Sequence, residues 1–182
     1  MRKLMLLSLT LLVVTPATAL TPDQVKAALK EKRGISYEIK TKFSWKRNDF
    51  GGGLVAFAST PYSRLTWVAQ AARERFEELT EDDIRAATAD TSLCVSTPVS
   101  ERPVQSVVLV PRNVKDPAPD NVIKSTETSK AIHDMYNKLG GQWKEASYTA
   151  CYPEGLNTED LDVVVVYQGG KPLRAPFPKN LR

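Results

Sequence analysis

The sequence has little of the residue types that build catalytic and metal sites. Its 182 residues include one histidine, His133, and two cysteines, Cys94 and Cys151. A single imidazole excludes the HExxH zinc motif and iron sites that need two histidines, and two cysteines with one histidine are a poor zinc ligand set. No CxxC pair is present, which disfavours a thioredoxin-type redox centre. We therefore assign no catalytic, cofactor-binding or metal-ligating residue.

Clusters of basic residues are absent as well. The formal net charge of the whole chain is +4. It falls to +2 without the first 19 residues, because Arg2 and Lys3 are the only charged residues in that segment. The remaining charges alternate in sign and form no Lys/Arg cluster that would neutralise a row of phosphates. Nucleic-acid binding is therefore not suggested.

The longest apolar segment lies at the N-terminus. Two basic residues precede an apolar run from Leu4 to Val14, and Ala17-Thr18-Ala19 has the small-x-small pattern of a cleavage site. The run is shorter than the ~20 residues that cross a bilayer, and no cysteine stands near the cleavage site to carry a lipid anchor. We expect residues 1–19 to be a cleaved signal peptide. Residues 20–182 are then expected to form a single exported, soluble domain, periplasmic or extracellular, with no membrane span.

Three segments carry helix signatures. Thr21 and Gln24 fit a capping box, which predicts a helix over about 22–33 that ends at a left-handed Gly34. Thr80 and Asp83 fit a second capping box, which predicts another short helix. Between them, apolar residues at three- and four-residue spacing predict an amphipathic helix whose stripe is covered most simply by a sheet face. The stripe consists of Leu65, Val68, Ala69, Ala72, Phe76 and Leu79.

Most of the other segments indicate β structure. Alternation and short apolar runs predict about seven strands, near residues 35–45, 54–58, 92–99, 104–110, 148–152, 162–167 and 172–177. Residues 122–146 are ambiguous, because 129–139 fits either one helix stopped by Gly140-Gly141 or an irregular crossover. We expect an α+β chain that is mainly β: an antiparallel β-sandwich with two or three inserted helices. An immunoglobulin-like arrangement is one form that such a sandwich takes.

The two cysteines are expected to form a disulfide. Exported chains with two cysteines usually pair them, and Cys151 as a nucleophile would have only His133 as its base. Alternation places Cys94 opposite the apolar side chains of its strand, and Cys151 opposite Tyr148, Ala150 and Tyr152. The bond therefore joins neighbouring strands of one sheet, or a strand to a loop, and does not cross the core as an immunoglobulin bridge does.

Four further patterns have a functional and a structural interpretation. His133 with its neighbour Asp134 lacks the GxSxG elbow of a serine hydrolase, which favours a surface histidine. The acids of one cluster attract Ca²⁺ in principle, but they lack the spacing of a calcium loop, and helix capping explains them. Turn acids near the C-terminus allow a carboxylate pair for glycoside cleavage, although solvated turn acids are the common case. The two acidic sets are Glu74, Glu77, Glu78, Glu81, Asp82 and Asp83, and Glu154, Glu159, Asp160 and Asp162.

Aromatic residues form the fourth pattern. They can line a groove for a sugar or a peptide, but core packing is the commoner role of such side chains. Trp67 stands out because it lies at the edge of the apolar helix stripe. The set comprises Trp45, Trp67, Trp143, Tyr62, Tyr136, Tyr148, Tyr152 and Tyr167.

The order of several motifs resembles a kind of secreted bacterial protein whose members are generally uncharacterised. The motifs are Thr60-Pro-Tyr-Ser-Arg-Leu65, the helix AARERFEELTEDDI, Cys94-Val-Ser-Thr-Pro98 and the distal ACYPEGL and DLDVVVVYQGGKPLRAPF. The last of these is also similar to the closing strands of immunoglobulin-like sandwiches. The resemblance spans about Pro61 to Phe177. It implies the fold and carries no catalytic residues.

These observations favour a non-enzymatic function. We expect an exported binding or structural module of the cell envelope that holds another protein or an envelope component through a sheet edge or a loop. This expectation rests on fold-level analogy. One alternative is a hydrolase with a carboxylate site that acts on envelope polymers, and another is a small-ligand carrier that uses the tryptophans and tyrosines.

Overall fold

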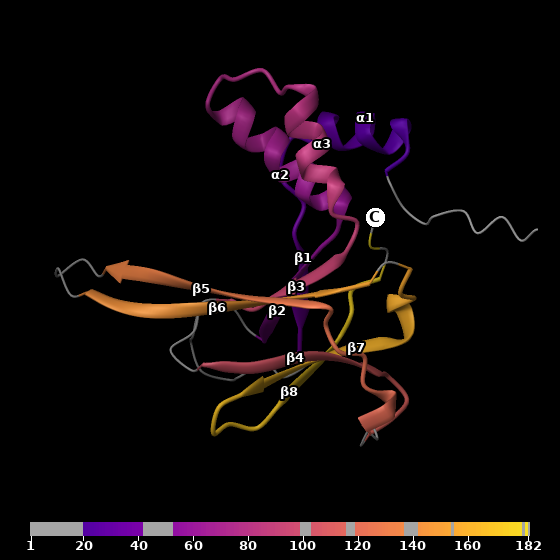
Figure 1. Ribbon diagram of the computed structural model, residues 1–182, viewed down its shortest axis with the longest axis vertical. Helices are drawn as coiled ribbons and strands as arrows, with labels where there is room; N and C mark the ends of the chain where they lie inside the picture. The colour runs from indigo at the N-terminus through magenta and orange to yellow at the C-terminus, as the bar shows by residue number, and fades with distance from the viewer. Residues whose placement is uncertain are drawn as a thin grey trace, which may run out of the picture.

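The computed structural model describes residues 20–41, 53–98, 103–115, 119–136, 142–153, 155–179 and 181. The predicted signal peptide lies outside these ranges, as do Trp45 and Glu154. Three helices and eight strands follow one another along the described chain, with short 3-10 turns before β5 and β7 (Figure 1). The helices are α1 (Pro22–Lys30), α2 (Pro61–Glu74) and α3 (Glu81–Ala89). The strands are β1 (Tyr37–Lys40), β2 (Leu54–Ser59), β3 (Leu93–Ser96), β4 (Val104–Pro111), β5 (Glu127–Tyr136), β6 (Gln142–Tyr152), β7 (Leu161–Tyr167) and β8 (Leu173–Pro176).

The strands form two antiparallel sheets that pack face to face. The larger sheet has the order β1-β2-β3-β6-β5, and the smaller has the order β4-β7-β8. Their inner faces share one buried apolar cluster, to which Val95 and Tyr152 contribute from the larger sheet and Leu109 and Val163 from the smaller. The Tyr152 hydroxyl donates a 2.8 Å hydrogen bond to the carbonyl of Val107 and so links the sheets. The predicted α+β class with a two-sheet antiparallel core is confirmed.

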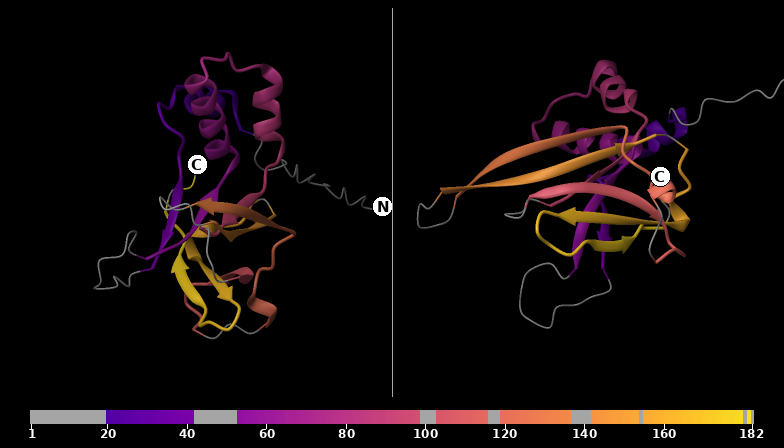
Figure 2. Two further views of the ribbon diagram at one scale, coloured as in Figure 1. Left: turned by 90° about the vertical axis from the view of Figure 1, so that its left-hand side faces the viewer. Right: turned by 60° about the horizontal axis from the view of Figure 1, so that its bottom comes forward.

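The helices form a separate layer with a core of its own. Figures 1 and 2 show them gathered at one end of the larger sheet, next to β1, β2 and β3. Ala28 of α1 packs with Tyr62 and Leu65 of α2, and Ile84 of α3 closes this second cluster. The expectation that a sheet face covers the stripe of α2 is wrong. Short helices α1 and α3 supply the apolar partners, because α2 continues directly from β2 and leaves the end of the sheet.

The predicted capping boxes are confirmed. Thr21 and Gln24 exchange side-chain and backbone hydrogen bonds at the start of α1, and Thr80 and Asp83 do the same at α3. Two members of the predicted stripe lie beyond the helix, because α2 ends at Glu74. Phe76 has a φ of 58° and is 98% exposed, whereas Leu79 packs against the core of the helical layer.

Gly34 has a role other than the predicted left-handed helix cap. Helix α1 ends at Lys30 with Glu31 as its cap, and the left-handed glycines of the described residues do not include Gly34. Its backbone instead lies under the ring of Trp67, where an added Cβ would be 2.3 Å from Trp67 Cδ2. The Trp67 indole donates a 2.9 Å hydrogen bond to the carbonyl of Ile35. A glycine is needed here because the chain approaches an aromatic ring closely.

Residues 122–146 also depart from both predicted alternatives. Strands β5 and β6 form an antiparallel hairpin with an unbroken register from Glu127 opposite Cys151 to Tyr136 opposite Gln142. The helix and the irregular crossover predicted for 129–139 are both wrong. Pairing with β6 outweighs the weak helical pattern of this segment, since tertiary context routinely overrides local propensity.

We predict that Gly34→Ala destabilises the fold by about 1–3 kcal/mol, the usual cost of overpacking. The new methyl group would overlap the Trp67 ring, so the cost should fall sharply in a Trp67→Ala background. Urea unfolding of the natural chain, both single variants and the double variant measures this coupling. An equal cost of Gly34→Ala in both backgrounds would contradict the steric explanation.

We further predict that stability falls in alkaline solution through Tyr152. Burial raises the pKa of its phenol well above the usual value of about 10, with a smaller contribution from Tyr148. The stability that comes from the neutral buried phenol is therefore complete below pH ~10 and is lost as the pH rises above it, because the unfolded chain ionises first. Tyr152→Phe should flatten this alkaline loss, while at neutral pH it costs about 1 kcal/mol for the lost hydrogen bond. Denaturant midpoints across the pH range test both effects, and an unchanged alkaline slope would contradict the assignment.

Candidate functional site

Cys94 and Cys151 form a disulfide, as the sequence predicted. They lie directly opposite each other on β3 and β6, with Cα atoms 4.0 Å apart and a separation of 57 positions in sequence. Their neighbours Val95 and Ala150 point into the core between the sheets, so the cysteines point out of the opposite face. The bond therefore joins neighbouring strands of one sheet, and the alternation of side chains predicted its direction.

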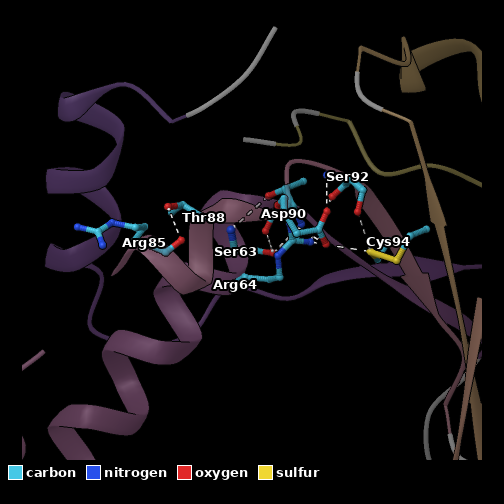
Figure 3. Close-up of polar contacts among 9 residues, drawn as sticks. Ser63, Arg64, Arg85, Thr88, Asp90, Ser92 and Cys94 are labelled. Atoms are coloured by element: carbon cyan, nitrogen blue, oxygen red, sulfur yellow. Dashed lines mark hydrogen bonds and ion pairs between the residues drawn. A yellow bond between two sulfur atoms is a disulfide. The ribbon is translucent and has the colours of Figure 1, made fainter. Parts of the chain in front are cut away.

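A partly buried guanidinium lies beside this disulfide (Figure 3). Arg64 of α2 donates one hydrogen bond to the carbonyl of Asp90 and another, of 3.2 Å, to the carbonyl of Ser92. Its Nη1 also approaches Cys94 Sγ at 4.0 Å, and the Ser92 hydroxyl lies 3.3 Å from the same sulfur. The Arg64 side chain thus joins α2 to the connection between α3 and β3. This contact lies next to the Cys94–Cys151 disulfide.

Charge and burial oppose each other at Arg64. Burial lowers the pKa of its guanidinium, and the Asp90 carboxylate, 3.6 Å from Nη2, partly offsets that effect. A side-chain hydrogen bond from Ser92 holds the pKa of Asp90 below its usual range, and the Ser92 N–H, at 2.9 Å, adds to this. A guanidinium stays protonated under all ordinary conditions. The Arg64 guanidinium therefore keeps its positive charge and donates hydrogen bonds to two backbone carbonyls.

Three of the predicted acids of the helical layer take part in a helix cap or an ion pair. Asp83 accepts hydrogen bonds from Thr80, and Glu77 pairs with Arg75 at 2.9 Å. Asp82 pairs with Arg85 at 2.9 Å. Across the ranges that the structure describes, no group of three His, Cys, Asp or Glu side chains is placed to hold a metal ion.

The three C-terminal acids within the described ranges do not converge on a pair of free carboxylates. Asp162 is buried between Arg112 and Arg174, with its two oxygens 3.0 Å and 2.8 Å from their Nε atoms. Arg174 also donates hydrogen bonds to backbone carbonyls at the end of β4 and in the loop after it, at residues 111, 112, 114 and 115. Glu159 and Asp160 are exposed on a 3-10 turn. Asp162 therefore holds the two arginines in place, and Arg174 in turn holds that loop.

The remaining candidates are distributed through the fold. Trp67 is half exposed and packs over Gly34, while Tyr62 and Tyr152 are buried in the two cores. His133 falls within β5, opposite Glu145, but the described structure places only its backbone. The side chains of Tyr136 and Trp143 likewise lie outside the described part of the structure. The described residues contain no helix that is both long and apolar enough to span a bilayer.

The hairpin of β5 and β6 is a feature that the sequence did not reveal. Figures 1 and 2 show it projecting past the smaller sheet as an arm. On the face of the arm that continues the core face, Ile132 is 66% exposed, although Tyr148 on the same face packs against the core. The arm thus carries an apolar side chain beyond the part of the sheet that is covered.

Strand β5 is also an open edge, since it pairs only with β6 among the described strands. The Tyr148 carbonyl accepts from Thr97 on the β3 side, and the Cys151 carbonyl accepts from Thr126 on the β5 side. Successive residues of a strand direct their backbone groups to opposite sides. Residues 127, 129 and 131 therefore bond to β6, and the N–H and C=O groups of Thr128, Lys130 and Ile132 face outward.

We predict that removal of the disulfide by Cys94→Ser with Cys151→Ser costs about 4 kcal/mol in the chain-entropy model for a loop of this length. Guanidinium unfolding of both proteins, with and without dithiothreitol, measures the loss. Reduction should lower the stability of the natural chain to that of the double variant and leave the variant unchanged. Equal stability of the oxidised natural chain and the variant would contradict this.

Comparison with known proteins does not identify a function for this chain. No protein-family model, no curated protein and no solved structure matches the chain. The arguments for function therefore come from the chain's own residues. The disulfide, with Arg64 beside it, stabilises the base of the arm. The open edge of β5 is the feature suited to an interaction with another strand.

Proposed function

We propose that this chain is an exported, non-enzymatic module of the cell envelope that binds an extended protein segment along the edge of β5. The observation that carries the proposal is the ten-residue edge itself, with its outward backbone groups and the exposed Ile132. Strand addition of this kind uses main-chain hydrogen bonds for affinity and alternate side chains for specificity.

The other sheet edges of the described chain are less suited to a partner. Strands β1 and β8 have only four residues each. Strand β4 has eight, but Ile123 lies against it and exchanges hydrogen bonds of 3.1 Å and 2.9 Å with Leu109. Natural proteins shorten or cover edges to prevent unwanted pairing. The long edge of β5, which no other described strand or segment covers, is therefore the best candidate for a functional one.

Two observations support the location and the rigidity of the module. The Cys94–Cys151 disulfide is typical of chains that fold in an oxidising compartment, which agrees with the predicted signal peptide. Cys151 is also the register partner of Glu127, where β5 begins. The covalent bond therefore stabilises the base of the arm and keeps its edge in place before a partner arrives, which reduces the entropy lost on binding.

The proposal predicts that an edge position contacts a protein in the cell. A photoreactive phenylalanine analogue at Ile132 should cross-link to a defined protein, detected by mass spectrometry. The same analogue at Phe76, which is exposed on the helical layer, is the matched control and should give no such product.

A second substitution separates strand addition from other contacts. Thr128→Pro removes an outward N–H and leaves the β6 hydrogen bonds intact, because proline is tolerated on an open edge. It should abolish the Ile132 cross-link while preserving the circular dichroism spectrum. Cross-links that persist in Thr128→Pro, or the absence of any product from Ile132, would sink the proposal.

A further inference from the structure

We propose that the segment bound at the edge of β5 is the β5 strand of a second copy of this chain. The two strands would run antiparallel about a twofold axis at Ile132. This inference rests on the proposed function and names its partner. The two five-stranded sheets would then join into one continuous sheet across the axis. A twofold contact of this kind uses the same surface on both copies and closes as a dimer.

The backbone of β5 permits this pairing. The groups that face outward belong to alternate residues, which are Thr128, Lys130, Ile132, Asp134 and Tyr136 by the phase of the hydrogen bonds. Antiparallel strands exchange both hydrogen bonds between residues that face each other directly. With the axis at Ile132, each of these residues meets another member of the same set, so every outward group obtains a partner.

The charges of β5 select that register. With the axis at Ile132, Lys130 of each copy is the register partner of Asp134 of the other, and Ile132 meets Ile132. A slip of two residues places Lys130 opposite Ile132 or Tyr136, and a slip of four places it opposite the second Lys130. Opposite charges across a strand pair stabilise it and like charges destabilise it. The centred register alone among these pairs both lysines with both carboxylates.

The same charges exclude other strands. A lysine on an edge is a common device against unwanted pairing, and Lys130 is exposed in the described chain. Opposite a carboxylate at the matching position it becomes favourable, whereas an unrelated strand leaves it without a partner. Specific interfaces combine attraction to the right partner with a penalty against others in this way.

Sedimentation of the purified protein over a concentration series tests the pairing. The natural chain should be a dimer. Lys130→Asp and Asp134→Lys should each weaken association about tenfold or more, because two attractive pairs become two repulsive pairs. Lys26→Asp, an equal charge reversal on exposed α1, should leave the dimer intact. Circular dichroism establishes that each variant is folded.

Complementation gives the sharper result. The double variant Lys130→Asp with Asp134→Lys restores both attractive pairs and should dimerise. An equal mixture of the two single variants should form a heterodimer, since one copy then supplies two carboxylates and the other two ammonium groups. A monomeric natural chain, or a dimer that is indifferent to both single reversals, would overturn the proposal, and so would failure of the mixture to associate.

The two proposals fail in different ways. If the Ile132 cross-link joins this chain to a different protein and the purified chain is monomeric, self-pairing is wrong and strand addition at the edge stands. If Ile132 yields no cross-link in the cell, strand addition itself is wrong. A cross-link between two copies at Ile132 supports both.

Discussion

The architecture depends on the pairing of β3 with β6. These strands join the first three strands of the larger sheet to the arm, and β3 contributes only four residues, from Leu93 to Ser96. Their inner side chains belong to the shared core, and Tyr152 adds the hydrogen bond to the smaller sheet. On the outer face the disulfide and the 2.8 Å contact between the Ser96 and Thr149 hydroxyls complete the pairing. The short β3–β6 pairing is thus stabilised by apolar packing on one face of the sheet and by the disulfide and hydroxyl contact on the other.

Polar groups connect the helical layer to the pair of strands β3 and β6. Its own core is apolar and separate from the core between the sheets. Arg64 of α2 donates to carbonyls in the connection just before β3, next to Cys94. Further along α2, the Thr66 and Gln70 side chains accept hydrogen bonds from the backbone of Ile35 and Gly34. The orientation of the helices therefore follows from directed hydrogen bonds more than from burial against the sheet.

Local signals in the sequence were sufficient for much of this structure. The capping residues Thr21 and Thr80 predicted helix starts, and alternation around Cys94 and Cys151 predicted both the disulfide and its face. The hairpin of β5 and β6 was not predictable in this way, since its strands are stabilised by each other and β5 lacks a regular apolar face. The roles of Gly34 and Arg64 depend on residues more than 25 positions away in sequence. The edge of β5 likewise exists only because the topology leaves it outermost.

The disulfide at the base of the arm also determines how a force on the arm is transmitted to the rest of the sheet. A pull on the arm reaches the rest of the larger sheet through β6, and at Cys151 the tension passes into β3 through a covalent bond. Beyond that point β5 pairs with β6 along an unbroken register. A force that separates β5 from β6 therefore leaves β6 covalently joined to β3 at Cys151.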